Sequence, residues 1–267
     1  MTDFTEISKR YEKDSFVQKS ASEQLFDLLK INTTDNVLDL GCGAGNLTKK
    51  IAEMTKGKVV GVDASEGMIA EAKKNYGGLG IDFAVCPVEE LNYTGCFDVI
   101  FCNSTFQWFK HPQVALKSCF NALKANGRIG IQAAGGKAYC PNFIQGTQKV
   151  AASLYLNKQF ANFTPPWNFM ETSKEYAALF ENAGFEVLHA EIDQTQSFHS
   201  PEEALKIFDS GAAAGYLNQQ YYCCPISEDY KSAFRNVVLE SFKEQANSEG
   251  QVDLVFYRIF LVAMKPQ

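Results

Sequence analysis

The chain has 267 residues, a net charge of -6, and 46% hydrophobic and 21% charged residues, which suits one large domain or a core domain with a cap. An acidic balance argues against broad nucleic-acid binding, which normally leaves a basic surface. No signal peptide is recognisable in the charged first 30 residues, and the best apolar run, 252–264, is short and interrupted by Asp253 and Arg258. The sequence therefore predicts a cytoplasmic protein without nucleic-acid or membrane partners.

The eight cysteines show no spacing typical of a metal site. No C-x-x-C pair is present, and only three histidines are available to complete a zinc site. In a cytoplasmic protein such cysteines are usually small buried residues. We therefore predict no metal site.

Strand and helix signals alternate through the first half of the chain. Apolar periodicity predicts the helices, and β-branched apolar runs predict the strands. The predicted order is helix 16–29, strand 36–40, helix 46–55, strand 58–63, helix 66–75, strands 81–85 and 97–103, helix 111–124 and strand 128–133. Such alternation with short links predicts an α/β fold with a doubly wound, Rossmann-like parallel sheet.

The second half of the chain has a different pattern of predicted elements. The predicted elements are helix 144–156, helix 173–183 closed by Gly184, strand 185–192, a helical stretch 201–246 and a last strand 252–263. We expect a core formed by residues 1–137, 173–199 and 247–267. Residues 138–172 and 200–246 are expected to form a mainly helical cap over a pocket.

The stretch VLDLGCGAGNL, residues 37–47, carries the main functional signal. Gly41, Gly43 and Gly45 follow a predicted strand, and ligands of open α/β sheets bind just beyond the carboxyl ends of strands. Asp63 ends the next strand, where its carboxylate would accept hydrogen bonds from ribose hydroxyls. The pattern therefore predicts an adenosine-like ligand.

The glycine spacing narrows the choice of ligand. A dinucleotide fingerprint, G-x-G-x-x-G, requires Gly or Ala at position 46, where this chain has Asn46. The actual pattern is D-x-G-x-G-x-G, with Asp39 before the first glycine. This arrangement suits a cofactor that has no pyrophosphate and has a charged amino-acid end. S-adenosylmethionine (SAM) is such a cofactor.

From about Tyr11 to Gln132, and again in its final two strands, the chain resembles the class I SAM-dependent methyltransferases. The motifs VLDLGCGAGN, CPVEEL, FDVIFCNSTFQW and LKANGRIGI carry the resemblance. It implies a seven-stranded sheet of six parallel strands and one antiparallel strand, with S-adenosylhomocysteine (SAH) as product. Family members often have an acidic residue at the position of Pro87, so adenine would be left to the Val88 backbone and Glu89. The implied cofactor-binding residues are Asp39, Gly41, Cys42, Gly43, Gly45, Asn46, Asp63, Ala64, Met68, Val88, Glu89, Asn103 and Gln107.

Two further stretches, RYEKDSFVQKSASEQL and NSTFQWFKHP, resemble the carboxyl methyltransferases. This group includes the trans-aconitate, malonyl-acyl-carrier-protein and juvenile hormone acid enzymes, and EEALKIFDSGAAAGYL is similar to the cap of the biotin-pathway members. The resemblance implies that Tyr11 and Gln18 close over the pocket, with Gln107 and Trp108 beyond the fourth strand. Tyr11, Gln18 and Trp108 are the implied catalytic residues.

A carboxylate acceptor fits this reading because it is already ionised at pH 7 and needs no general base. Alignment of the reactants and exclusion of water then supply the catalysis. The acceptor is predicted to be a small-molecule or carrier-bound acid, with Arg235 or Lys137 neutralising a second carboxylate. His199 is an alternative general base, and Trp108 and Phe106 can also be read as core residues.

Three alternatives remain open at this point. The enzyme could methylate a ring carbon, a hydroxyl or an amine, or the chain could be a non-catalytic SAM-binding protein. Its oligomeric state, monomer or homodimer, is also open.

Overall fold

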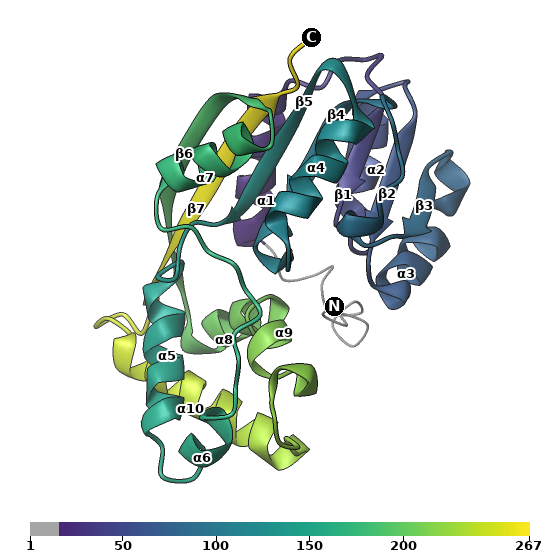
Figure 1. The fold of residues 1–267 in the computed structure, drawn as a ribbon. Helices are drawn as coiled ribbons and strands as arrows, with labels where there is room; N and C mark the ends of the chain where they lie inside the picture. Colours follow the sequence, from purple (N-terminus) through teal and green to yellow (C-terminus); the bar gives the residue numbers. More distant parts are fainter. Residues whose placement is uncertain (1–15) are drawn as a thin grey trace.

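A seven-stranded sheet in the order β3-β2-β1-β4-β5-β7-β6 forms the centre of the molecule (Figure 1). The computed structural model describes residues 16–267, with side chains from residue 21 onward. The strands are β1 (Val37–Leu40), β2 (Val59–Asp63), β3 (Asp82–Val85), β4 (Phe97–Asn103), β5 (Leu123–Ala134), β6 (Glu186–His199) and β7 (Val252–Met264). Because β7 pairs antiparallel with both β5 and β6 and the other pairs are parallel, the predicted six-plus-one arrangement is confirmed.

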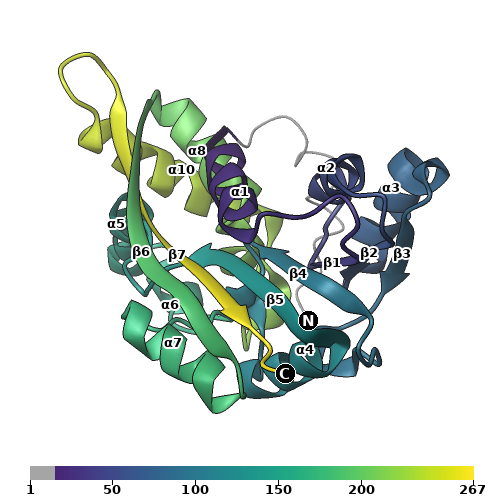
Figure 2. The ribbon, with the colours of Figure 1, turned by 90° about the horizontal axis from the view of Figure 1, so that it is seen from above.

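Helices cover both faces of the sheet (Figure 2). One face carries α1 (Phe16–Leu29), α2 (Asn46–Met54) and α3 (Glu66–Tyr76), and the other carries α4 (Pro112–Ala122) and α7 (Ser173–Asn182). Phe26 of α1 stacks on Phe101 of β4 with ring centroids 4.6 Å apart. On the opposite face Tyr176 and Phe180 of α7 are fully buried. The two apolar layers explain why the inner strands are apolar on both sides. Short 3-10 turns η1 (Gly77–Leu79), η2 (Val88–Glu90) and η3 (Phe106–Trp108) link the first-half elements.

A separate group of helices lies below the carboxyl ends of the strands in Figure 1, and we call it the helical lobe. It comprises α5 (Pro141–Ala152), α6 (Asn157–Phe160), α8 (Pro201–Ser210), α9 (Ala213–Tyr216), the turn η4 (Gln219–Tyr221) and α10 (Glu228–Gln245). Its core is aromatic and includes Phe143, Phe208 and Phe234. The predicted cap ranges contain these helices, but Val252 and Phe256 of β7 also belong to the lobe's core.

The largest differences from the predicted elements lie in β5, β6 and α5. Strand β6 continues to His199 rather than ending at residue 192, because its second half pairs with β7 as a two-stranded ribbon that reaches the lobe. Backbone pairing holds this ribbon, so its sequence is more polar than a core strand. Strand β5 begins at Leu123, inside the predicted helix, and α5 begins three residues earlier than predicted, with Pro141 in its first turn.

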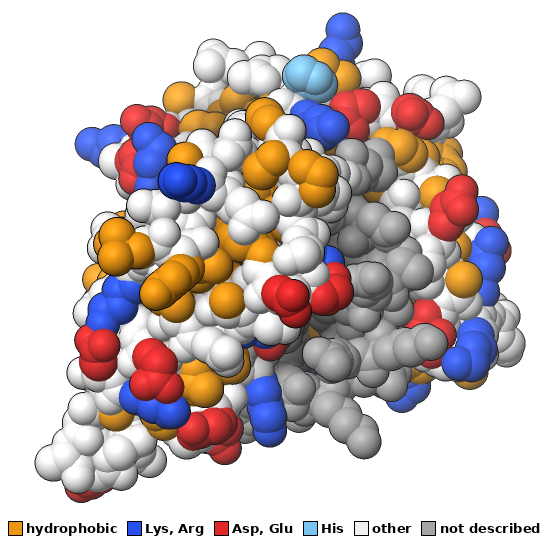
Figure 3. Space-filling view, turned by 90° about the horizontal axis from the view of Figure 1, so that it is seen from below, with side chains coloured by type: hydrophobic (Ala, Val, Ile, Leu, Met, Phe, Trp, Pro, Cys, Tyr) orange, Lys and Arg blue, Asp and Glu red, His pale blue; other side chains and the backbone are white. Residues whose placement is uncertain are grey.

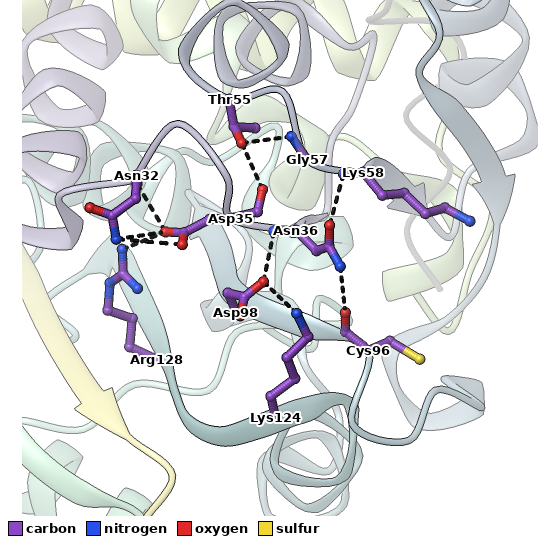
Figure 4. Close-up of polar contacts among 10 residues, drawn as sticks. All are labelled: Asn32, Asp35, Asn36, Thr55, Gly57, Lys58, Cys96, Asp98, Lys124 and Arg128. Atoms are coloured by element: carbon purple, nitrogen blue, oxygen red, sulfur yellow. Dashed lines mark hydrogen bonds and ion pairs between the residues drawn. The ribbon is translucent and has the colours of Figure 1, made fainter.

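Polar contacts tie together the amino ends of the strands, at the edge opposite the glycine loop (Figure 4). The Asn36 N–H donates to Asp98 Oδ2 at 2.8 Å, and Lys124 Nζ donates to the same oxygen at 2.7 Å. Arg128 Nη2 reaches Asp35 Oδ2 at 2.8 Å. These contacts fix the register of β1, β4 and β5 independently of the carboxyl ends, where the glycine loop lies.

We expect Arg128→Met to destabilise the fold by about 2–4 kcal/mol, because it leaves the buried Asp35 carboxylate without its cationic partner and removes the Arg128 donor from two carbonyls at the end of α1. The measurement is the free energy of unfolding from urea titration. Lys58→Met is the matched control, since Lys58 pairs with Asp82 where both side chains are more than half exposed. Equal effects of the two substitutions would contradict the assigned role of Arg128.

On the face shown in Figure 3, Lys and Arg side chains are interspersed with Asp and Glu, and the described residues form no continuous basic patch there. This mixture matches the acidic net charge of the chain. Within residues 16–267, none of the helices combines the length and apolar character needed to cross a membrane.

Candidate functional site

A cavity of about 900 Å³ lies between the carboxyl ends of the strands and the helical lobe. Its size is within the usual range of small-molecule sites. One part, the glycine-loop half, is lined by residues 40–44 and by residues that follow β2, β3 and β4. The other, the lobe half, is lined by the end of β5, the start of α5, residues 256–258 of β7, the segment before α7, and the end of α8 with the turn after it. A cavity with two such halves has room for two ligands end to end.

Glycine is required at the three positions of the loop for different structural reasons. All have positive φ, at 76° for Gly41, 53° for Gly43 and 89° for Gly45. A Cβ at Gly41 would lie 2.2 Å from Thr105 Cγ2, and one at Gly45 would lie 3.0 Å from the Tyr76 ring. A Cβ at Gly43 would meet no atom within 4 Å. Gly41 and Gly45 therefore serve packing, whereas Gly43 keeps the cavity open beside the backbone.

This difference predicts opposite phenotypes for two similar substitutions. Gly41→Ala should lower the free energy of unfolding by at least about 2 kcal/mol, because it combines a steric clash with a left-handed backbone. Gly43→Ala should cost only about 1 kcal/mol but should weaken binding of an adenosine cofactor more than tenfold. Urea titration and calorimetric titration of each variant with SAH test the pair. Normal cofactor affinity in Gly43→Ala would place the ligand elsewhere.

Asp63 lies at the carboxyl end of β2 and lines the cavity. Its Oδ2 accepts from the Gly43 N–H at 3.0 Å, and its Oδ1 accepts from the Ser65 N–H at 2.8 Å. Burial raises the pKa of Asp63, and these backbone hydrogen bonds work in the opposite direction. Each oxygen keeps a lone pair, so the carboxylate can hold the glycine loop and still accept from a ligand.

Asp39 is buried behind the loop, with 2% of its surface exposed, and is not among the cavity-lining residues. Its Oδ2 accepts from Thr48 Oγ1 at 2.6 Å, and burial raises its pKa to about 7. Gly45 also lies off the cavity wall, at the start of α2. Neither residue lies on the cavity wall, so their contact with the cofactor remains a prediction from the sequence.

The other predicted cofactor residues converge on the glycine-loop half of the cavity. They are Gly41, Cys42, Gly43, Asn46, Asp63, Ala64, Met68, Val88, Glu89, Asn103 and Gln107. Asn46 is oriented by Tyr76, whose hydroxyl donates to Asn46 Oδ1 at 2.7 Å. Pro87 and the buried Val88 form the apolar wall after β3, with Glu89 beside them.

The turn after β4 contains one strained backbone residue and two buried side-chain oxygens that accept no hydrogen bond from any described residue. Ser104 has a φ of 55°, which is unusual for a non-glycine residue, and its N–H donates to the Gln132 carbonyl at 2.7 Å. Gln107 Nε2 donates to the Ser104 carbonyl at 3.0 Å, which fixes its amide orientation. Among the described residues, buried Gln107 Oε1 and Asn103 Oδ1 have no hydrogen-bond donor. Both residues line the cavity, so the site offers two acceptors to a ligand that donates.

Of the predicted catalytic residues, only Trp108 has a described side chain. It lines the cavity at the junction of the two halves, with its ring centroid 5.6 Å from that of Trp167. Phe106 is buried in the core instead. Tyr11 lies outside the described residues, and Gln18 lies in α1 outside the described side chains.

Three candidates for acceptor chemistry lie away from the cavity wall. Arg235 pairs with Asp209 at 2.8 Å inside the lobe, Lys137 lies near Glu171 on the surface, and His199 contacts Ser197 at the end of β6. None of the three is a cavity-lining residue. The predicted roles of Arg235 and Lys137 are therefore not supported by their positions.

Arg258 of β7 is a cavity-lining residue that sequence reasoning missed. It is 7% exposed, and its guanidinium lies over the Phe256 ring at 4.9 Å. The sequence did contain a signal for its special position, because Arg258 is a charged residue within a predicted strand that is otherwise largely apolar. Ser104 and Gln132 were also missed, and no spacing in the sequence distinguishes them.

Comparisons with known proteins agree with this geometry. A family model described as a methyltransferase domain matches residues 31–184. The chain is 24% identical to a malonyl-acyl-carrier-protein O-methyltransferase of Acetivibrio thermocellus over 98% of this chain and 92% of that protein. It is 33% identical to the Priestia megaterium enzyme of the same name, over 47% of each chain. A Haemonchus contortus phosphoethanolamine N-methyltransferase, solved with SAM, has the same fold, with a TM-score of 0.55 and 17% identity over 93% of this chain and 53% of that one.

The fold and the glycine-loop site define a class I, SAM-dependent methyltransferase, as the sequence predicted. The family match extends over more than half of the chain. This protein therefore belongs to the methyltransferase domain family.

Proposed function

We propose that SAM binds in the glycine-loop half of the cavity, with its methyl group directed toward Trp108 and the lobe half. SAM supplies the methyl group when bound and is left as SAH. Asp63 would accept from the ribose hydroxyls, and the wall of Pro87 and Val88 would cover the adenine. The unsatisfied oxygens of Asn103 and Gln107 suit the ammonium group of the methionine end, which donates only.

Asp39 would act on the cofactor indirectly. Its carboxylate lies behind the glycine loop and would attract the same ammonium group through the loop rather than by contact. Cys42, Asn46, Ala64, Met68 and Glu89 would complete the walls around the cofactor. Gln18 and Tyr11 keep their expected roles of orienting the acceptor and closing the pocket.

The acceptor that fits the lobe half best is a carboxylate, which would become a methyl ester. The observation that carries this proposal is the lining of the lobe half: from β5 onward, the described residues that face the cavity include no His, Asp, Glu or Lys, and the described cavity-lining residues of these types, His111 included, come earlier in the chain. A hydroxyl or ammonium acceptor would need a base to remove its proton. A carboxylate is already ionised, so the protein only has to orient it and exclude water.

Under this proposal the helical lobe acts as a substrate cap. The segment before α7 is fastened to η3, since the Asn168 N–H donates to the Gln107 carbonyl at 2.9 Å. Trp167 packs against Gly215, where a Cβ would lie 2.2 Å from its ring. The segment that contains Trp167 is therefore held rigidly between η3 and the lobe. A lobe half that is fixed in this way favours a small acid or the acid end of a carrier-bound acyl group.

The test is calorimetric titration with SAM and SAH, followed by an assay of SAH release on a panel of free and carrier-bound acids at several pH values. We expect release on at least one acid class, with a rate that changes little above pH 6 because the acceptor stays ionised. Release on ring, hydroxyl or amine compounds alone would overturn the carboxylate proposal. Binding of SAM without release on any compound would favour the non-catalytic alternative.

A further inference from the structure

The ends of β4 and β5 bring three polar side chains together at the cavity wall. Asn103 and Gln132 are paired across the two strands, and Ser104 follows Asn103 directly. All three residues line the cavity, and Gln132 is only 1% exposed. Buried amides and hydroxyls are normally paired with one another or with a ligand. The hydrogen bonds among these side chains therefore decide what this part of the wall offers to a ligand.

These hydrogen bonds run in one direction. Gln132 Nε2 donates to the Ala133 carbonyl at 3.4 Å, so Gln132 Oε1 is left to face Ser104. Ser104 Oγ donates its single proton to this oxygen at 3.0 Å and accepts from Asn103 Nδ2 at 3.3 Å. A reversed Gln132 amide would place its oxygen against the Ala133 carbonyl oxygen, and both atoms only accept. The β5 backbone therefore fixes the direction of the chain of Asn103, Ser104 and Gln132, which we call the amide relay.

The amide relay determines which end of the Asn103 amide is left for a ligand. Because Asn103 Nδ2 is directed to Ser104, Asn103 Oδ1 is the end without a donor among the described residues. The backbone of Asn103 is held separately, since Thr105 Oγ1 donates to its carbonyl at 3.0 Å. An ammonium group only donates, so an amide oxygen attracts it and an amide N–H repels it. The direction of the relay therefore decides whether Asn103 favours or opposes an ammonium group.

Ser104 links the two amides from an unfavourable backbone conformation. Its φ of 55° lies in the left-handed region, where a residue with a Cβ is destabilised. Glycine adopts this conformation readily but has no hydroxyl to join the amides. Gln132 holds the strained residue twice, because its carbonyl accepts from the Ser104 N–H at 2.7 Å and its Oε1 accepts from the Ser104 hydroxyl. Strain that is held in this way is typical of functional sites.

We propose that Ser104 and Gln132 are positioning residues, which hold the Asn103 amide with its oxygen toward the ammonium group of the cofactor's methionine end. This inference rests on the proposed placement of SAM in the glycine-loop half and deepens it. The two residues act on the ammonium group through Asn103. They make the site selective for adenosine ligands that carry a primary ammonium group. The preference for SAH over deamino-SAH, in which a hydrogen replaces that group, measures the selectivity directly.

The experiment measures the affinities for SAH and deamino-SAH by calorimetric titration, and the midpoint of thermal unfolding of each variant. The wild type should bind SAH about 10- to 100-fold more tightly than deamino-SAH. Ser104→Ala and Ser104→Gly both remove the hydroxyl and free the Asn103 amide to reverse, so each should reduce this preference about 3- to 10-fold. Ser104→Ala keeps the strained backbone and should lower the unfolding midpoint more than Ser104→Gly, which relieves the strain. We therefore expect an equal loss of preference at unequal stability.

Gln132→Leu interrupts the relay at its other end. It removes the acceptor of the Ser104 hydroxyl, whose proton can then turn to Asn103 Oδ1, so the preference for SAH should fall by a similar factor. A double variant of Ser104→Gly and Gln132→Leu should lose no more than either single variant, because both break one chain. Lys30→Gly is the matched control. Lys30 is an exposed residue with a φ of 49° that does not line the cavity, so this substitution relieves similar strain and should keep the preference.

Four outcomes would overturn this inference. A wild type that binds both ligands equally would leave no role for the ammonium group. An unchanged preference in Ser104→Gly and Gln132→Leu would mean that other contacts hold Asn103. Equal weakening of SAH and deamino-SAH would assign the two residues a structural role, and additive losses in the double variant would show two independent effects. Failure of the proposed cofactor site is distinguishable, because Asp63→Ala would then leave the affinity for SAH unchanged.

Discussion

Asp63→Ala is expected to weaken binding of SAM and SAH about 100-fold. Two charge-assisted hydrogen bonds to the ribose would be lost, each contributing about 1.5–3 kcal/mol, and partial replacement by water reduces the sum. The Gly43 N–H would also lose its acceptor, which loosens the loop against the ligand. Calorimetric titration of the variant, with its thermal unfolding measured in parallel, checks the result.

The same carboxylate predicts a pH dependence of binding. Burial raises the pKa of Asp63, so its protonation, which removes acceptors for the ribose, should begin at a higher pH than for an ordinary aspartate. Wild-type affinity should therefore fall as the pH is lowered, and Asp63→Ala should lack the part of this fall that comes from Asp63, leaving the part that comes from Asp39. Asp82→Ala removes an exposed carboxylate at the start of β3 and is the matched control. Unchanged SAM affinity in Asp63→Ala would show that the ribose is bound elsewhere.

The glycine-loop half of the cavity is predictable from sequence because its signals are local. Gly41, Gly43 and Asp63 each follow directly from a strand end, and parallel strands bring their carboxyl ends to one edge. The alternation of apolar strands and amphipathic helices predicted the sheet for the same reason. The sequence could not distinguish a packing glycine from one that borders the cavity, because that depends on Thr105, more than 60 residues away from Gly41.

The lobe half of the cavity is poorly predictable because its residues meet only through tertiary pairing. Arg235 and Lys137 appeared suitable because cap cations were expected near a substrate, but the fold pairs them with nearby carboxylates. Arg258 belongs to a strand that the sequence assigned to the core. It reaches the cavity only because β7 runs antiparallel, so that its amino-terminal half extends past the end of β5.

The raised pKa of Asp39 predicts that its buried carboxylate lowers the free energy of unfolding at neutral and higher pH. Its folded-state pKa of about 7 exceeds the ordinary value of 3.8, so the unfolded chain releases this proton at lower pH than the folded protein does. The contribution of Asp39 is therefore most favourable below about pH 4 and is lost as the pH rises through 7. We expect Asp39→Asn, which keeps an acceptor for Thr48, to be more stable than the wild type at pH 8, by on the order of 2 kcal/mol.

Urea titrations of the two proteins at pH 5 and pH 8 test this expectation, and the gap should be small at pH 5 and wide at pH 8. Asp27→Asn, in the exposed face of α1, is a control that should shift stability little at either pH. A gap that is the same at both values would mean that Asp39 titrates normally.

If Asp39 attracts the methionine ammonium group through the loop, the more stable variant should also bind SAM about tenfold more weakly, because that attraction is lost with the charge. A variant that gained stability and kept full affinity would reduce Asp39 to a packing role, and the electrostatic support of the cofactor would then rest on Asp63 and the amide oxygens of Asn103 and Gln107.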